Sequence, residues 1–122
     1  MKANELMIGD WVRNDLNQVE KVFELRETQA MLSYNDLYNY EDLQPIPLTS
    51  EILKNNFEKK TMYGIFDDYF DLDIREFNDG MYIVNYHCCE MPMPDTQIVG
   101  ICYVHELQHA LHFLGIDKEF QL

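Results

Sequence analysis

The chain has 122 residues, of which 47% are hydrophobic and 13% aromatic, enough apolar material for the core of one folded domain. No run of about 18 apolar residues is present, so a membrane-spanning segment is not expected. Nine basic residues stand against 22 acidic ones, which gives a formal charge of −13, and Lys59 and Lys60 form the one adjacent basic pair. Direct binding of nucleic acid is therefore not expected.

The start of the chain and the cysteines indicate where the protein works. The first residues lack the basic segment followed by an apolar segment that marks a signal peptide. The cysteine count is odd, and Cys88 and Cys89 are adjacent while Cys102 stands apart, a pattern that is not typical of a secreted disulfide framework. We expect a cytoplasmic protein with reduced thiols.

Short strands are predicted for the first third of the chain. Residues 7–12, 19–27 and 30–34 favour strands, with a turn at residues 13–15. In the second strand Val19, Lys21, Phe23 and Leu25 share one face and Val22 lies on the other, so the alternation is loose. This pattern predicts a small β meander or an SH3-like barrel.

A connector and a short helix are predicted next. The prolines at positions 45 and 47 impose extended backbone on residues 43–48, which are predicted to pack their apolar side chains. Thr49 or Ser50 is then a candidate N-cap for a helix that runs to about Phe57, and Glu51 lies in its first turn.

The second half is predicted to contain a β-hairpin and a C-terminal helix. Residues 70–75 alternate apolar and charged side chains, residues 78–80 favour a turn, and residues 81–86 form the return strand. Prolines in residues 91–94 are expected to break the sheet. A helix over residues 102–114 follows, with Gly115 placed to end it. Its apolar stripe consists of Val104, Leu107, Leu111 and Leu114.

Three sequence blocks together resemble a known family. MKANELMIGDWV opens the chain, PIPLT begins at Pro45, and YVHELQ begins at Tyr103. In that order they resemble a family of small proteins from Bacteroidetes genomes, in phage and prophage settings. The resemblance spans the chain, with a looser match in the central strands, and implies a bacterial or phage-encoded cytoplasmic protein without catalytic residues to transfer. The family's closing block reads like YVHQLQNLYFALTG, with other residues in place of Glu106 and His109, which favours a structural helix.

The HELQH run at residues 105–109 matches the sequence pattern of a zinc-hydrolase motif. His105 and His109 share one face of a helix and could both bind a zinc ion, and Glu106 could accept a proton from the metal-bound water. A usual third ligand is missing, because the extended motif needs Gly at 112 and His at 115, whereas the chain has His112 and Gly115. The 13 residues after His109 are too few for a second helix with a glutamate ligand, and Glu119 would have to fold back. The hydrolase is an alternative hypothesis.

A structural zinc site is a second metal hypothesis. Its residues would come from the C-terminal helix and from a strand end: Cys102, His105, His109 and His112, with His87, Cys88 and Cys89. None of the usual spacings of paired zinc ligands is present. The favoured interpretation is a polar helix face with surface imidazoles and one half-buried thiol.

Acidic and aromatic clusters have simpler interpretations. Four aspartates lie close in the sequence, but the EF-hand pattern is absent and alternation with apolar residues points to the solvent face of a strand. These are Asp67, Asp68, Asp71 and Asp73. The aromatic side chains are interpreted as core or interface: Trp11, Tyr34, Tyr38 and Tyr40.

The sequence therefore predicts an α+β fold that is mostly β: a meander or SH3-like N-terminal part, a central hairpin and a C-terminal amphipathic helix. One domain over residues 1–122 is expected, with a possible division into 1–48 and 49–122. The predicted function is non-catalytic binding of a protein partner through the C-terminal helix or residues 34–40, without a cofactor, metal or membrane. The alternatives are a zinc-dependent hydrolase and an acidic mimic of nucleic acid, and self-association is open.

Overall fold

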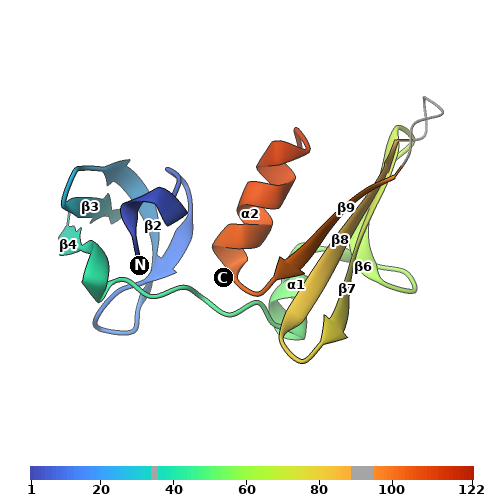
Figure 1. Ribbon diagram of the computed structural model, residues 1–122. Helices are drawn as coiled ribbons and strands as arrows, with labels where there is room; N and C mark the ends of the chain where they lie inside the picture. Colours follow the sequence, from blue (N-terminus) through green and yellow to red (C-terminus); the bar gives the residue numbers. More distant parts are fainter. Residues whose placement is uncertain (34–35, 89–94) are drawn as a thin grey trace. The chain divides into compact units, whose positions relative to one another are not determined.

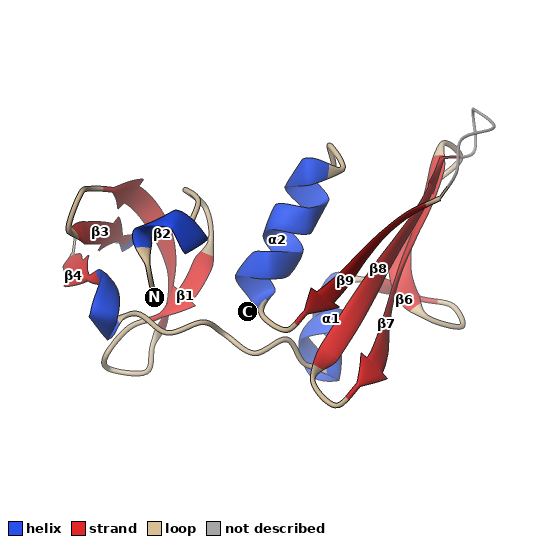
Figure 2. Cartoon of the chain, viewed as in Figure 1, coloured by secondary structure: helices blue, strands red, loops and turns tan. Residues whose placement is uncertain are grey.

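The first sheet is an antiparallel meander of four short strands, seen in a computed structural model of the protein (Figures 1 and 2). The structure describes residues 1–33, 36–88 and 95–122, so Tyr34, Cys89 and the break expected at residues 91–94 lie outside the described part. The strands pair in sequence order: β1 Trp11–Arg13, β2 Val19–Leu25, β3 Gln29–Leu32 and β4 Leu37–Asn39. The predicted meander is confirmed, and β4 is an additional strand.

After β4 the chain returns to β1. The 3-10 helix η3 (Tyr40–Asp42) leads into Gln44, whose backbone exchanges two N–H···O hydrogen bonds of 2.9 Å with Arg13. A second 3-10 helix, η1 (Ala3–Glu5), precedes the sheet. Six buried apolar side chains form the core of the meander: Leu6, Val12, Val22, Ala30, Leu32 and Leu43. Because residues before, within and after the strands all contribute, the N-terminal part has a hydrophobic core of its own.

The first strand is shorter than predicted. It begins at Trp11 rather than at residue 7. Gly9 has a φ of 95°, a left-handed conformation that glycine adopts without steric cost, and the Asp10 amide donates to the Met7 carbonyl at 3.1 Å. Residues 7–10 therefore form a turn, and the prediction of a strand there is wrong.

Strand β2 buries the face with fewer apolar side chains. Glu20 and Val22 are buried, whereas Val19 and Phe23 are exposed. The pairing with β3 shifts register between Val22 and Glu24, so Phe23 is the extra residue of a β-bulge. The loose alternation of the sequence reflects this bulge.

The C-terminal helix α2 spans Val104–Phe113. Three of its four predicted stripe residues are buried: Val104, Leu107 and Leu111. Gly115 has a φ of 76°, its amide donates to the His112 carbonyl at 3.0 Å, and the Ile116 amide donates to the Leu111 carbonyl at 2.8 Å. This is a Schellman motif. The predicted helix and its glycine end are confirmed, although the helix begins two residues later than predicted.

The second sheet has five antiparallel strands in sequence order. They are β5 Glu58–Lys59, β6 Tyr63–Phe66, β7 Phe70–Asn78, β8 Met81–Cys88 and β9 Thr96–Ile101. The predicted hairpin is confirmed as β7 and β8, joined by a tight turn in which Gly80 has a φ of 76°. The buried side chains Leu72, Ile74 and Val84 share one face of this sheet, because Ile74 pairs with Val84 in the ladder.

The short helix α1 (Ser50–Asn56) precedes this sheet. Thr49 is its N-cap, since the Thr49 Oγ1 accepts a hydrogen bond of 3.2 Å from the Ile52 amide. The preceding connector buries Leu43, Ile46 and Leu48, as predicted. The cap and the helix are therefore confirmed together with the connector.

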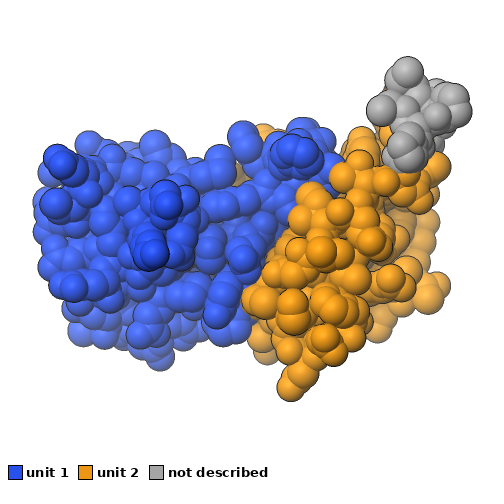
Figure 3. All heavy atoms as spheres, viewed as in Figure 1, with its two compact units in different colours: residues 1–47, 103–116 blue, residues 48–102, 117–122 orange. Residues whose placement is uncertain are grey.

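The chain divides into two units, coloured separately in Figure 3. Unit 1 holds residues 1–47 and 103–116, and unit 2 holds residues 48–102 and 117–122. In unit 2 the Phe120 ring packs edge-on against Phe57, with centroids 5.8 Å apart, and the Asn56 side chain exchanges two hydrogen bonds with the Gln121 backbone. The fold is α+β and mostly β: two antiparallel sheets and a C-terminal helix.

Candidate functional site

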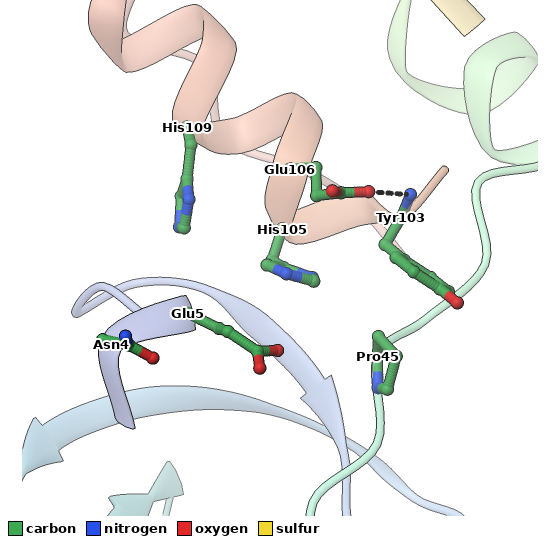
Figure 4. A pocket seen from close by; sticks show the side chains of 7 residues that line it. All are labelled: Asn4, Glu5, Pro45, Tyr103, His105, Glu106 and His109. Carbon is green, nitrogen blue, oxygen red and sulfur yellow. Dashed lines mark hydrogen bonds between the residues drawn. The ribbon is translucent and has the colours of Figure 1, made fainter. Parts of the chain in front are cut away.

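The candidate site lies in unit 1 at the start of α2. Tyr103 is the N-cap of the helix, and its backbone amide donates to the Glu106 Oε1 at 3.1 Å (Figure 4). A carboxylate at the third helical position satisfies an amide that has no partner within the helix and also lies at the positive end of the helix dipole. Glu106 therefore stabilises the helix start. It is the same carboxylate that the zinc-hydrolase hypothesis needs as proton acceptor.

His109 pairs with a buried carboxylate from the turn before β1. The His109 Nε2 lies 2.6 Å from the Asp10 Oδ2, and the same oxygen accepts the Met7 amide at 2.8 Å. The Asp10 side chain is 3% exposed and that of His109 is 31% exposed. A carboxylate this deeply buried needs hydrogen-bonded partners, and His109 is one of them.

The neighbouring residue Gln108 holds the same turn. Its side-chain oxygen accepts the Trp11 amide at 2.9 Å, and its side-chain nitrogen donates to the Gly9 carbonyl at 3.0 Å. These two bonds satisfy the Trp11 amide and the Gly9 carbonyl as the backbone of an adjacent strand would. Residues 108 and 109 of α2 therefore fix residues 9–11 from the helix side.

His105 is buried and has one nitrogen without a partner. The residue is 5% exposed, and among the described residues no group forms a hydrogen bond with its Nδ1. Burial lowers the pKa of the His105 imidazole below 6.5; the nearby His109 adds to this, while the Asp10, Glu106 and Glu5 carboxylates oppose it. An unpaired buried polar atom costs about 1–3 kcal/mol. The prediction of a surface imidazole at this position is wrong.

A pocket of about 330 Å³ opens beside these histidines. In Figure 4 the His105 and His109 side chains extend from α2 toward the side where Asn4 and Glu5 lie. The other lining residues are Pro45, Tyr103 and Glu106. The Tyr103 ring stacks on the His105 ring, with centroids 5.9 Å apart and planes 16° apart. The volume is at the small end of the range of ligand pockets.

The pocket lining combines two imidazoles, two carboxylates and a phenol. A carboxylate-oriented imidazole such as His109 is a common general base. However, the seven lining residues include no serine, threonine or cysteine that this base would activate. Among the described residues, no group of three histidine, cysteine, aspartate or glutamate side chains is placed to hold a metal ion. The groups that line the pocket offer hydrogen bonds and charge.

The remaining zinc candidates are spread through the chain. Cys102 is half-buried as predicted, but it precedes α2 and so is not on the helix face. His112 is exposed in the last turn of α2. His87 in β8 pairs through its Nδ1 with the Asp95 carboxylate at 2.6 Å, and Cys88 ends the same strand. Cys89 lies outside the described residues.

The four clustered aspartates occupy a turn and the β7 strand. Asp67, Asp68 and Asp71 are exposed, and the Asp67 carboxylate accepts the Tyr69 amide at 2.9 Å. Asp73 is half-buried and accepts a bond of 3.0 Å from Asn85, which in turn accepts one from Gln97. This polar ladder crosses β7, β8 and β9. The expected solvent-facing strand is confirmed for Asp71.

The tyrosines predicted as core or interface are partly core. Tyr38 and Tyr40 pack at the edge of the unit 1 core. The Tyr40 hydroxyl donates to the Arg26 carbonyl, and the Tyr38 hydroxyl lies 3.4 Å from the Asn14 side-chain amide. Burial, with the nearby Glu20 carboxylate, raises the pKa of Tyr38 above 10.0. Tyr34 lies outside the described residues.

Comparison with protein-family models, with curated proteins and with solved structures finds no match in any of the three. In the part of the chain that the structure describes, no helix is both long enough and apolar enough to cross a membrane. The functional interpretation therefore depends on the geometry of the chain itself.

Four pocket or pairing residues carry no recognisable signal in the sequence. Asp10 lies in a segment predicted as a strand, Asn4 and Glu5 precede it, and Pro45 lies in the extended connector. Asp10 and His109 are 99 positions apart, so no local spacing relates them. Periodicity identifies residues that share one element, whereas this pocket is assembled from three separate segments.

Proposed function

We propose that the protein is a non-catalytic binding protein that takes a protein partner on unit 1. One observation carries this proposal: two large apolar side chains, Ile8 and Phe23, are each 69% exposed, and the backbone residues next to them are hydrogen-bonded to each other. The Gly9 amide donates to the Val22 carbonyl at 2.8 Å, which aligns the turn before β1 with the bulge of β2. We name these two side chains the Ile8–Phe23 surface. Contiguous exposed apolar surface is typical of sites that contact another protein.

The functional groups of α2 support binding over catalysis. Glu106 accepts the hydrogen bond that begins the helix, and His109 pairs with Asp10. A zinc hydrolase needs both residues for the metal and its water. Since both already serve the fold of unit 1, the hydrolase alternative has less support than binding.

The negative charge of the chain favours partners with a basic contact surface. A formal charge of −13 favours a partner whose contact surface is basic around an apolar centre, because opposite potentials accelerate association and disfavour other partners. The resemblance of the MKANELMIGDWV, PIPLT and YVHELQ blocks supports a phage or mobile-element origin and a cytoplasmic location. The proposed occupant is thus a basic protein of the same cell.

Selection from a random peptide library tests the proposal. We expect binders that combine apolar and basic residues. The double variant Ile8→Ser with Phe23→Ser should lose them, because it removes the exposed apolar side chains without touching the core. Val99→Ser in unit 2 is the matched control, since Val99 is an apolar side chain that is 61% exposed on a strand. It should bind the same peptides as the unmodified chain.

Four outcomes oppose the proposal. Failure to enrich any peptide, or equal binding by the double variant, would exclude the Ile8–Phe23 surface as the contact. A dimer in sedimentation that the double variant abolishes would show that a second copy of the chain occupies the surface instead. Competition of the protein with DNA for basic proteins, unaffected by the double variant, would favour the nucleic-acid mimic.

A further inference from the structure

We propose that the end of α1 carries a peptide-binding site, which residues 117–122 of the same chain occupy and which an extended segment of a basic partner protein takes in their place. We name these residues the 117–122 segment. Both α1 and the 117–122 segment belong to unit 2, whereas the Ile8–Phe23 surface belongs to unit 1. The proposal therefore goes beyond the one above, and a failure of either leaves the other one standing.

One aromatic side chain anchors the 117–122 segment. The segment has no regular secondary structure, and Phe120 is its one buried residue, 4% exposed. The Phe120 ring packs edge-on against Phe57, the residue that ends α1, with centroids 5.8 Å apart. An irregular segment with a single buried side chain opens locally at a lower free energy than the whole fold unfolds. Its opening uncovers the Phe57 ring, which is 7% exposed while the segment is bound.

A buried amide of α1 binds the backbone of the segment. The Gln121 amide donates to the Asn56 Oδ1 at 2.6 Å, and the Asn56 Nδ2 donates to the Gln121 carbonyl at 3.0 Å. The same Nδ2 donates to the Ile52 carbonyl at 2.8 Å, which fixes the orientation of the side chain. Asn56 is 6% exposed, whereas Gln121 is exposed. Main-chain hydrogen bonds beside a contact for one side chain are a general mode of binding extended peptides.

The segment also places a cation on the site. The Lys118 Nζ lies over the Phe57 ring, 5.5 Å from its centroid. Lys118 and Phe120 are two positions apart, so one ring of α1 contacts both of them. The occupant that the structure shows is therefore a basic residue, an aromatic residue two positions later, and a following residue that offers its backbone. We write this pattern as Lys-x-Phe-x.

A basic partner protein is favoured over a second copy of the chain. A second copy offers the same segment, so it adds no contact that the chain does not already make with itself. The covalent link gives the chain's own segment an effective concentration on the order of millimolar, which a second copy at ordinary concentrations does not match. Two copies with a formal charge of −13 also repel each other, whereas a basic segment is attracted.

A capped peptide with the sequence of residues 116–122, IDKEFQL, is the probe. The full chain with Phe120→Ala loses the anchor of its own segment, so its site is open to the peptide. Titration of this isotope-labelled variant, followed through the backbone resonances of residues 50–59, should show saturable shifts. The unmodified chain should bind the peptide at least about tenfold more weakly, because a site that is open for about a tenth of the time loses affinity by that factor.

Modified peptides test each contact without a change to the protein. Alanine in place of the peptide's phenylalanine should abolish binding, and glutamine in place of its lysine should weaken binding roughly two- to fivefold, the range for an exposed cation–π contact. Methylation of the backbone nitrogen of the peptide's glutamine removes the donor to the Asn56 Oδ1 and should weaken binding about tenfold or more. Alanine in place of that glutamine keeps the backbone donor and should leave the affinity unchanged.

Substitutions in α1 locate the site, each made in the Phe120→Ala chain. Asn56→Ala removes both bonds to the peptide backbone and should abolish binding. Asn55→Ala is the matched control, because Asn55 is exposed at the neighbouring position of the same helix, and it should leave the affinity unchanged. If Asn56→Ala fails to fold, the methylated peptide tests the same bond in an intact protein.

Several results would overturn the proposal. It is wrong if the Phe120→Ala chain shows no saturable shifts, if that chain binds the peptide no more tightly than the unmodified chain, or if the methylated peptide binds equally well. A concentration-dependent dimer of the unmodified chain that Phe120→Ala abolishes would identify a second copy as the occupant instead. Loss of peptide binding on Ile8→Ser with Phe23→Ser would place the contact on unit 1 rather than on α1.

Discussion

Replacement of His109 by alanine measures how strongly the Asp10 pair holds α2 to the first sheet. Asp10 would keep the Met7 amide at 2.8 Å but lose the His109 Nε2 at 2.6 Å. Removal of one partner from a fully buried ion pair costs about 3–5 kcal/mol. Because the His109 side chain is 31% exposed, water reaches the vacated space and restores part of this loss. We expect a decrease of about 2 kcal/mol in the free energy of unfolding.

Urea denaturation at pH 7 measures this decrease, and the melting temperature should fall by about 8 °C, since 1 kcal/mol corresponds to about 4 °C for a chain of this size. Two variants serve as controls. His109→Gln places an amide donor within reach of Asp10 and should restore most of the stability. His112→Ala removes an exposed imidazole from the same helix and should change stability little. Equal losses for alanine and glutamine at 109 would refute the role of the hydrogen bond.

Three further predictions concern a buried imidazole, a close backbone approach and metal. His105 has a folded pKa below its unfolded value of 6.5, so the unfolded chain binds the proton more readily, and stability is lost as pH falls from about 7.5 through 6.5 toward the folded pKa. The variant His105→Phe should therefore show a smaller change in the free energy of unfolding with pH over that window, measured by urea denaturation. An unchanged dependence on pH would contradict burial as the cause. At Gly64 a Cβ would overlap the Leu72 carbonyl oxygen and lie 3.0 Å from its carbon, so Gly64→Ala should destabilise the protein by about 3 kcal/mol in urea, whereas Glu58→Ala on the adjacent strand should be near neutral. Protein purified without chelator should contain substoichiometric zinc by atomic emission; stoichiometric zinc that is lost in the variant His105→Ala with His109→Ala would favour the hydrolase.

The elements that the sequence predicts well are those whose signals are local. The hairpin follows from period-two alternation in residues 70–75 and from Gly80, and α1 follows from Thr49 before a run of helix formers. The end of α2 follows from Gly115, because a residue with positive φ suits the Schellman motif. In each of these cases neighbours within a few positions determine the backbone.

The elements that the sequence does not predict depend on distant partners. Strand β5 has two residues and exists because Glu58 pairs with Gly64, and β9 is paired along one edge of β8 with a register shift. The turn at residues 7–10 is closed by Val22 and by the α2 side chains of Gln108 and His109, each 99 positions from its partner. Periodicity within a segment carries no information about such pairings.

The position of the HELQH run within its helix determines its role. His105 and Glu106 are the second and third residues of α2, where the backbone amides still lack partners within the helix. A glutamate there binds the N-cap amide, as Glu106 binds that of Tyr103, whereas in mid-helix those amides are already bonded and the carboxylate remains available for a metal-bound water. The spacing of the two histidines is the same in both settings. The start of the helix, which the sequence places two residues too early, therefore determines that Glu106 caps it.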